Sequence, residues 1–184
     1  MQRVSIVGNS GSGKTTLGRA LAAALGVPFV EIDSLVHQPG WAELSREELR
    51  KRVSLLIAAD GFVIDGNYRS RVGDLVLGRA DTVVWLDLPK WTVRLRVLRR
   101  TLRRAVTRQE LWNGNKEPWS NLYSRDPTRS VVVWSWTHHE AYRAQYEQEM
   151  AETAGAVRWV RLRSAAEVRR FLTAARVSPP AAPS

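Results

Sequence analysis

The residues best suited to chemistry begin at Gly8, in a run of glycines and hydroxyl side chains that ends on one lysine. The spacing is G-x-x-x-x-G-K-[ST], and the run follows a predicted strand and opens a predicted helix. Closely spaced glycines let backbone N–H groups surround phosphates, and Lys14 and Thr15 would serve as catalytic cation and metal ligand. The alternative is an ordinary glycine-rich turn, but the agreement of pattern and context favours binding of ATP and Mg²⁺. The expected nucleotide-binding residues are Gly8, Asn9, Ser10, Gly11, Ser12, Gly13, Lys14, Thr15 and Thr16.

A second feature is a one-sided run of positive charge. Seven arginines lie between Arg94 and Arg108, and no acidic residue interrupts them. An exposed helix face usually mixes signs to gain i,i+4 pairs, so this run repels itself unless an anion neutralises it. Phosphoryl transfer spreads negative charge over oxygens that arginines stabilise. We expect Arg100, Arg104 and Arg108 to act on phosphate, although each arginine taken alone is more typical of a solvated surface.

Composition limits the class of protein. The 184 residues suit one domain, and with 44% hydrophobic and 25% charged residues the chain is neither disordered nor fibrous. The absence of cysteine excludes disulfides and thiolate metal sites, and no apolar run is long enough to span a membrane. We therefore expect a cytoplasmic protein with no membrane partner. The net charge of +10 indicates anionic partners, although a GC-rich genome rich in arginine codons would give the same bias.

The elements that must position these residues alternate between short apolar runs and segments of helical periodicity. This alternation predicts an α/β fold with parallel strands and right-handed crossovers. The expected strands are Arg3 to Val7, Pro28 to Ile32, Phe62 to Asp65, Thr82 to Leu88 and Val157 to Leu162.

Two helices are expected in the first half of the chain. One begins within residues 13–16 and ends at Gly26. The other begins at Ser45, which forms a capping box with Glu48. The second helix is expected to bury Leu49, Val53, Leu56 and Ile57.

Three more helices are expected in the second half. One follows Pro89 and is expected to be apolar inside and basic outside, with a buried stripe of Trp91, Leu95, Leu98 and Leu102. After a loop over residues 113–126, another would begin at Asp126. Its apolar positions would be Val131, Trp134, His138, Tyr142 and Tyr146. A last helix spans residues 165–175.

Several sequence blocks resemble one group of enzymes. A GTPase would carry N-K-x-D, which is absent. With the glycine-rich run, the blocks resemble the adenylate-kinase-related group of P-loop kinases, and more narrowly the bacterial topology modulation (FlaR-like) proteins, over about Met1 to Phe171. The blocks are Ile32-Asp33-Ser34-Leu35, Gln38-Pro39-Gly40-Trp41, Val63-Ile64-Asp65-Gly66-Asn67-Tyr68 and Trp85-Leu86-Asp87-Leu88-Pro89.

The resemblance implies a three-layer fold with a five-stranded parallel sheet in the order 2-3-1-4-5 and an arginine-rich lid at about 94–125. Residues 1–176 would form this single domain, and residues 177–184 a disordered tail. Asp65 would end beside the P-loop strand and hold Mg²⁺, or else cap the turn that follows it.

The same resemblance implies an acceptor site beside the second strand. Asp33 would bind the acceptor and orient or deprotonate its hydroxyl; the alternatives are a helix cap or a salt bridge to Arg69 or Arg71. Arg69 would bind an acceptor phosphate or carboxylate, as in the adenylate kinase Asp-Gly-Phe-Pro-Arg block. The chain departs from that block at Asn67 and Tyr68, which argues against a nucleotide acceptor.

The leading hypothesis from these residues is an ATP- and Mg²⁺-dependent kinase of a small acceptor that the sequence does not identify. A nucleic-acid-binding ATPase or regulator is the second hypothesis, based on the net charge, the arginine-rich helix and the name of the topology modulation proteins, although no nucleic-acid-binding motif is present. A third is slow ATP hydrolysis with the lid as a switch.

Overall fold

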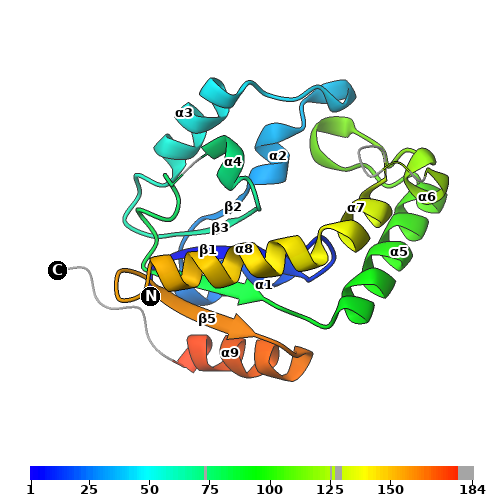
Figure 1. Ribbon diagram of the computed structural model, residues 1–184. Coiled ribbons are helices and arrows are strands. Elements are labelled where there is room, and N and C mark those ends of the chain that lie inside the picture. Colours follow the sequence, from blue (N-terminus) through cyan, green and yellow to red (C-terminus); the bar gives the residue numbers. More distant parts are fainter. Residues whose placement is uncertain (73, 125, 127–129, 178–184) are drawn as a thin grey trace.

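The computed structural model describes residues 1–72, 74–124, 126 and 130–177. A five-stranded sheet forms the middle layer, with helices on both faces (Figure 1). Neighbouring strands are all parallel, in the order β2-β3-β1-β4-β5, which confirms the predicted class and strand order. The strands are β1 (Arg3–Gly8), β2 (Phe29–Glu31), β3 (Phe62–Asp65), β4 (Thr82–Leu86) and β5 (Arg158–Leu162).

The helices account for most of the remaining described residues. The short helices α2, α4 and α6 lie where the sequence predicted no helix. The α-helices are α1 (Lys14–Leu25), α2 (Ile32–Val36), α3 (Arg46–Leu56), α4 (Arg69–Val72), α5 (Lys90–Thr107), α6 (Ser120–Tyr123), α7 (Val131–Thr137), α8 (His139–Glu152) and α9 (Ala165–Val177), with 3-10 turns η1 (Pro39–Trp41) and η2 (Trp112–Gly114). Of the expected tail, only Val177, the last residue of α9, lies within the described residues.

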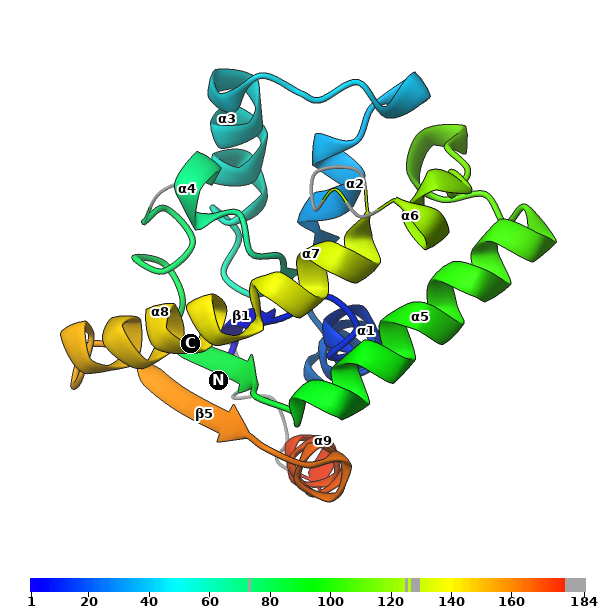
Figure 2. The ribbon, with the colours of Figure 1, turned by 45° about the vertical axis from the view of Figure 1, so that its right-hand side comes forward.

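The core is divided between the two faces of the sheet. Helices α1 and α9 cover one face, and α8 crosses the other with α3 and α4 beside it (Figures 1 and 2). Along β1, Val4 and Ile6 pack in the cluster that includes α1, while Val7 packs with Tyr146 of α8. Burial on both faces is typical of a parallel sheet. It holds β1 rigidly in the middle, so the loop that follows β1 has a fixed base.

Helix α3 begins as predicted but buries less of its surface. The Ser45 hydroxyl accepts a hydrogen bond from the Glu48 amide at 3.2 Å, and Leu49 and Val53 are buried. Leu56 is exposed, so the prediction that it is buried was wrong.

Helix α5 has the predicted extent, but the expected inner face was wrong. Its buried side chains are Val93, Val97, Thr101 and Ala105, and the predicted stripe of tryptophan and leucines faces outward. The physical reason is the closeness of the P-loop. A Cβ added to Gly11 would lie 2.3 Å from a methyl of Val97, so only small side chains fit between α5 and the loop. Leucines at these positions would push the helix away.

The helix predicted to run through Val131 and Tyr146 is broken in two at His138, between α7 and α8. The Ser130 hydroxyl caps α7 by accepting from the Val133 amide at 3.3 Å. Tyr146 is buried as expected, but Trp134 is partly exposed, so its prediction as a core residue was wrong.

Candidate active site

The loop between β1 and α1 has the conformation that phosphate binding requires. Gly11 and Gly13 adopt positive φ angles of 82° and 100°, which side chains with a Cβ rarely tolerate. Gly13 is the N-cap of α1 and makes no side-chain cap bond, so the amides of the first turn face the loop. Free amides at a helix N-terminus bind anions. The expected nucleotide-binding segment is therefore built as a cradle of main-chain donors.

Lys14 lies across this cradle. Its ammonium donates hydrogen bonds to the carbonyl oxygens of Gly8 and Asn9, at 2.8 Å and 3.2 Å. These contacts hold the positive charge directly beside the loop. A phosphate bound there would meet this ammonium and the loop amides together.

The cradle opens into a large cleft of about 910 Å³. Its walls come from the P-loop, the inner side of α5, the end of β2 and the start of α9. The volume lies near the upper end of small-molecule sites and suits a nucleotide together with a second small molecule. Ala165 and Val168 line the part of the cleft near α9.

Thr15 and Asp65 meet at the base of the cleft, as the sequence predicted. The Thr15 hydroxyl donates to the Asp65 carboxylate at 2.6 Å and lies 3.4 Å from Glu31. The pairing of Ile6 with Asp65 across β1 and β3 fixes this position. Burial raises the pKa of Asp65 to about 6, although Lys14 and the Thr15 hydrogen bond oppose the shift.

These oxygens have the chemistry that Mg²⁺ prefers, a hydroxyl and carboxylates on a rigid frame. No group of three or more histidine, cysteine or acidic side chains able to hold a metal occurs in the described parts of the chain. Thr15 and Asp65 are side chains that could hold a magnesium ion.

Asp33 lies in the first turn of α2 and lines the same cleft. The sequence placed it at the end of the second strand, but that strand ends at Glu31. Its carboxylate accepts a hydrogen bond from the Tyr68 hydroxyl at 2.7 Å. Burial, with Asp33 as the next cause, raises the pKa of Tyr68, so the phenol keeps its proton and acts as the donor. No salt bridge joins Asp33 to Arg69 or Arg71, whose partners are other acids.

Three arginines of α5 lie one turn apart on the side of the helix that faces the cleft. Arg96 donates to the carbonyl oxygen of Ser12 at 3.2 Å, and Arg100 donates to the Ser10 hydroxyl at 3.1 Å. Arg104 lies one turn further along and makes an ion pair with Glu117 at 3.6 Å.

Arg100 is the most confined of the three. Burial, followed by the charge of Arg104, lowers the pKa of Arg100, which shows that this charge lies in an unfavourable surrounding. The Nε atoms of Arg100 and Arg104 are buried and have no hydrogen-bond partner. An anion in the cleft would relieve both conditions.

Two predicted residues lie elsewhere. Arg108 is the exposed C-cap of α5, with φ of 50°, and is not among the residues that line the cleft. Arg96, which lines the cleft, was not predicted. Its spacing of four from Arg100 and of eight from Arg104 was available as a signal, but the prediction chose arginines further along the helix.

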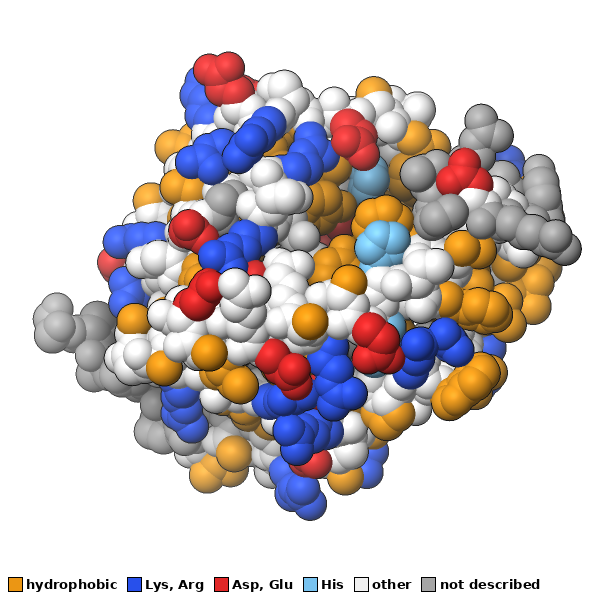
Figure 3. Space-filling model, viewed as in Figure 1, with side chains coloured by type: hydrophobic (Ala, Val, Ile, Leu, Met, Phe, Trp, Pro, Cys, Tyr) orange, Lys and Arg blue, Asp and Glu red, His pale blue; other side chains and the backbone are white. Residues whose placement is uncertain are grey.

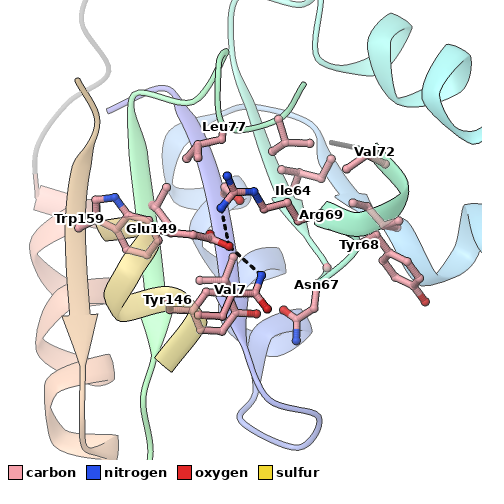
Figure 4. A pocket seen from close by; sticks show the side chains of 16 residues that line it. Val7, Ile64, Asn67, Tyr68, Arg69, Val72, Leu77, Tyr146, Glu149 and Trp159 are labelled. Carbon is pink, nitrogen blue, oxygen red and sulfur yellow. Dashed lines mark hydrogen bonds and ion pairs between the residues drawn. The ribbon is translucent and has the colours of Figure 1, made fainter. Parts of the chain in front are cut away.

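Arg69 also lies outside the cleft. It points into a separate cavity of about 50 Å³ between β3 and α8 (Figure 4). There it pairs with Glu149 at 2.7 Å and with Asp74 at 3.0 Å. The structure therefore does not bring Arg69 to the expected acceptor site. Asn67 links this region to the P-loop through hydrogen bonds with the amide and carbonyl of Gly8.

The segment after α5 is joined to the loop after α2. Asn115 donates to the carbonyl of Gln38 at 2.9 Å and accepts from the amide of Trp41 at 3.0 Å. Asn113 donates to the carbonyls of Ser34 and His37. These bonds connect the expected lid with the expected acceptor side of the cleft.

Similar proteins agree with this architecture. A family model described as shikimate kinase matches residues 10–46. The chain is 30% identical over 107 residues to a shikimate kinase of Sulfurihydrogenibium sp., covering 50% of this chain and 64% of that protein. A shikimate kinase of Brucella canis is 25% identical over 177 residues, covering 83% and 88%. The match to the first of these relatives spans less than two thirds of its length.

A crystal structure of a gluconokinase from Sinorhizobium meliloti superposes with a TM-score of 0.52 at 22% identity, covering 95% of this chain and 91% of that one. The fold is that of P-loop kinases. The cleft described above is bordered by the loop after β1 and by the ends of the neighbouring strands of this fold. Among the described helices, none is both long and apolar enough to cross a bilayer.

Proposed function

We propose that the protein is an ATP- and Mg²⁺-dependent kinase that phosphorylates a hydroxyl group of a small molecule. The observation that carries this proposal is that one cleft holds the P-loop, the Thr15–Asp65 pair, Asp33 and the guanidinium groups of α5. Phosphoryl transfer needs little more than positioning and charge stabilisation, and each of these groups provides one of the two.

The P-loop would bind the phosphates of ATP. Gly11 supports this role, because a Cβ there would collide with Val97 and the φ of 82° disfavours other residues. Lys14 would contact the β- and γ-phosphates, and Arg96 and Arg100, which border the loop at Ser12 and Ser10, would stabilise charge on the transferred group. Thr15 and Asp65 would hold Mg²⁺, which neutralises phosphate charge when bound.

Asp33 would act on the acceptor. Its carboxylate would take the proton of the acceptor hydroxyl, whose oxygen would then form a bond to the γ-phosphorus while the bond to the leaving ADP oxygen breaks. Tyr68 would hold Asp33 in place through the hydrogen bond of 2.7 Å. Arg104 would complete the site on the acceptor side, since its side chain lines the cleft.

The acceptor is proposed to be a small polyhydroxylated molecule. The similar proteins are named for shikimate and gluconate, and these two compounds are the first to test. Arg69 is not offered as an acceptor ligand, because Glu149 and Asp74 occupy its guanidinium. The narrower likeness to topology modulation proteins belongs to the same proposal and adds no substrate.

The test is ADP formation from Mg-ATP in the presence and absence of candidate acceptors. We expect Lys14→Ala to lower turnover by at least a hundredfold, because the ammonium lies on the loop that binds the transferred phosphate. Asp33→Asn should remove acceptor-dependent turnover by 10²- to 10⁴-fold and leave ATP affinity intact. Unchanged turnover in Lys14→Ala would contradict the proposal, and turnover without any acceptor would favour the hydrolase alternative.

The nucleic-acid alternative has less support in this arrangement. Its main argument was the arginine run of α5, but Arg96, Arg100 and Arg104 turn into the cleft. These side chains are accounted for by phosphates of a nucleotide.

A further inference from the structure

The outer face of α5 is apolar, and no described residue covers it. Helix α5 runs along the rim of the molecule (Figure 2), and hydrophobic side chains gather on that rim in the space-filling view (Figure 3). Each member of this row is between 41% and 69% exposed. We name it the α5 stripe: Trp91, Leu95, Leu98, Leu102 and Val106.

The rotation of α5 leaves no way to bury the α5 stripe against the described residues. The buried side of the helix is locked by Val93 and Val97, each at most 1% exposed. Turning the stripe inward would expose these side chains and withdraw Arg100 from Ser10. The stripe therefore needs a partner from outside the described chain.

The pattern of the α5 stripe fits one helix as that partner. From Trp91 to Leu102 the spacing is four, three and four residues, which is the a/d seam by which two helices interlock. Such a seam is narrower than the wide apolar face that a helix needs to lie in a lipid surface. Arg96 and Arg100 point into the cleft, so fewer arginines of α5 remain on the outer side to reach lipid headgroups.

The size of the surface also suits a protein partner. From the exposed fractions, the stripe presents on the order of 500 Å² of apolar surface, near the largest patches on monomers and a substantial part of the roughly 800 Å² per partner in a specific interface. Trp136 of α7 enlarges it, with Arg94 held between the rings of Trp91 and Trp136 at 4.8 Å and 5.0 Å. The two rings hold this guanidinium in place by cation–π contact at one edge of the stripe.

We propose that a second copy of this chain covers the α5 stripe, so that two α5 helices pair about a two-fold axis. A two-fold axis brings identical surfaces together, and a seam of this spacing is complementary to itself. The other edge of the stripe carries Arg99, which is exposed and makes no ion pair among the described residues. Two copies of Arg99 repel each other, so salt should strengthen the pairing by screening them.

Cross-linking gives a direct test because the chain has no cysteine of its own. Leu98→Cys places one thiol at the centre of the stripe. Leu55→Cys on α3 is the control, because Leu55 is even more exposed, at 70% against 41% for Leu98. We expect oxidation to link the first variant into a disulfide-bonded dimer and to leave the control monomeric. Trp91→Cys then distinguishes parallel from antiparallel helices, since only parallel pairing brings two residues 91 together.

Sedimentation equilibrium provides the second measurement. We expect a dimer whose dissociation constant is lower at 0.5 M salt than at 0.1 M salt. Leu98→Lys should raise that constant at least tenfold, whereas Leu55→Lys should not change it. Circular dichroism verifies that both variants are folded.

A wild-type protein that stays monomeric up to about 100 µM, or a dimer that Leu98→Lys leaves intact, would overturn the proposal. The stripe would belong to a lipid surface if the protein is monomeric and sediments with phosphatidylglycerol vesicles, and if Leu98→Lys abolishes that binding by removing the apolar contact. This outcome would also overturn the proposal. None of these outcomes depends on kinase activity, so the proposed function and this proposal can fail separately.

Discussion

Asp65 is a buried carboxyl group that suits a metal ion but lowers the stability of the protein when no metal is bound. It is 4% exposed, and its strongest partners are the Thr15 hydroxyl and the nearby charge of Lys14. Burial favours the neutral form, so its pKa rises to about 6 from the ordinary value of 3.8. At neutral pH the free protein therefore holds an ionised group in a place that resists ionisation.

The consequence for stability has a definite sign. Because the folded pKa exceeds the unfolded one, the contribution of Asp65 is fully present below pH 3.8 and is lost as the pH rises through 6. We expect Asp65→Asn, which cannot ionise, to gain roughly 3 kcal/mol relative to the wild type between pH 4 and pH 7. Urea unfolding at several pH values measures this difference. If the free energies of unfolding of the two proteins change in parallel with pH, this prediction is wrong.

At the scale of an element, α5 divides its side chains between the cleft and the surface. Adjacent arginines have opposite environments: Arg100 donates to Ser10 of the P-loop, and Arg99 is exposed. This pair offers a matched comparison that the sequence alone does not supply.

We expect Arg100→Gln to lower the turnover number by 10²- to 10³-fold, because a charge directed at the transferred phosphate is lost. Arg99→Gln should stay within twofold of the wild type. Steady-state kinetics with saturating Mg-ATP makes the comparison, and thermal unfolding verifies that both variants are folded. Equal losses in the two variants would show that only the net charge of the helix matters.

The same helix shows where prediction from sequence ends. Its start followed from the sequence, but two faces of it carry apolar residues at spacings of three to four, and periodicity does not choose between them. The choice depends on the approach of Val97 to Gly11, two residues separated by 86 positions. Local signals, by contrast, predicted the P-loop, the Ser45 cap and the start of α1, because each depends on neighbours in sequence.

At the scale of the whole molecule, the cleft is closed by contacts between distant segments. Asn115 is buried and uses both atoms of its amide on the loop that holds Gln38 and Trp41. Backbone strain gathers here too, since Trp41 and Asn113 have positive φ angles of 62° and 56°. Strain of this kind persists only where surrounding contacts impose it.

We expect Asn115→Ala to loosen this connection and raise the KM for the acceptor severalfold, with a smaller effect on the KM for ATP. The reason is that Ser34 to Trp41 adjoin Asp33, whereas the P-loop keeps its own contacts. Hydrogen exchange of the Trp41 amide, which donates to Asn115, reports the loosening directly. Exchange as slow as in the wild type would show that the contact is not needed to hold the loops together.

The family resemblance implied both the strand order and the place of Arg69, and only the first was confirmed. Asp65 and Thr15 meet because β3 lies beside β1, as the resemblance implied. Arg69 was placed by likeness to another kinase block, but Glu149 of α8 draws it to the opposite side of the sheet. The break at His138, which no local pattern indicated, sets the course of that helix.

The central position of β1 has a consequence for how the protein is made. Its two neighbours, β3 and β4, come much later in the chain and end at Asp65 and Leu86. A chain leaving the ribosome must therefore extend past Leu86 before its first strand is flanked on both sides. Until then β1 lacks its β4 neighbour, and the loop proposed to bind ATP stands on a less rigid base. In an assay during translation, a nucleotide should stabilise only nascent chains that extend past Leu86.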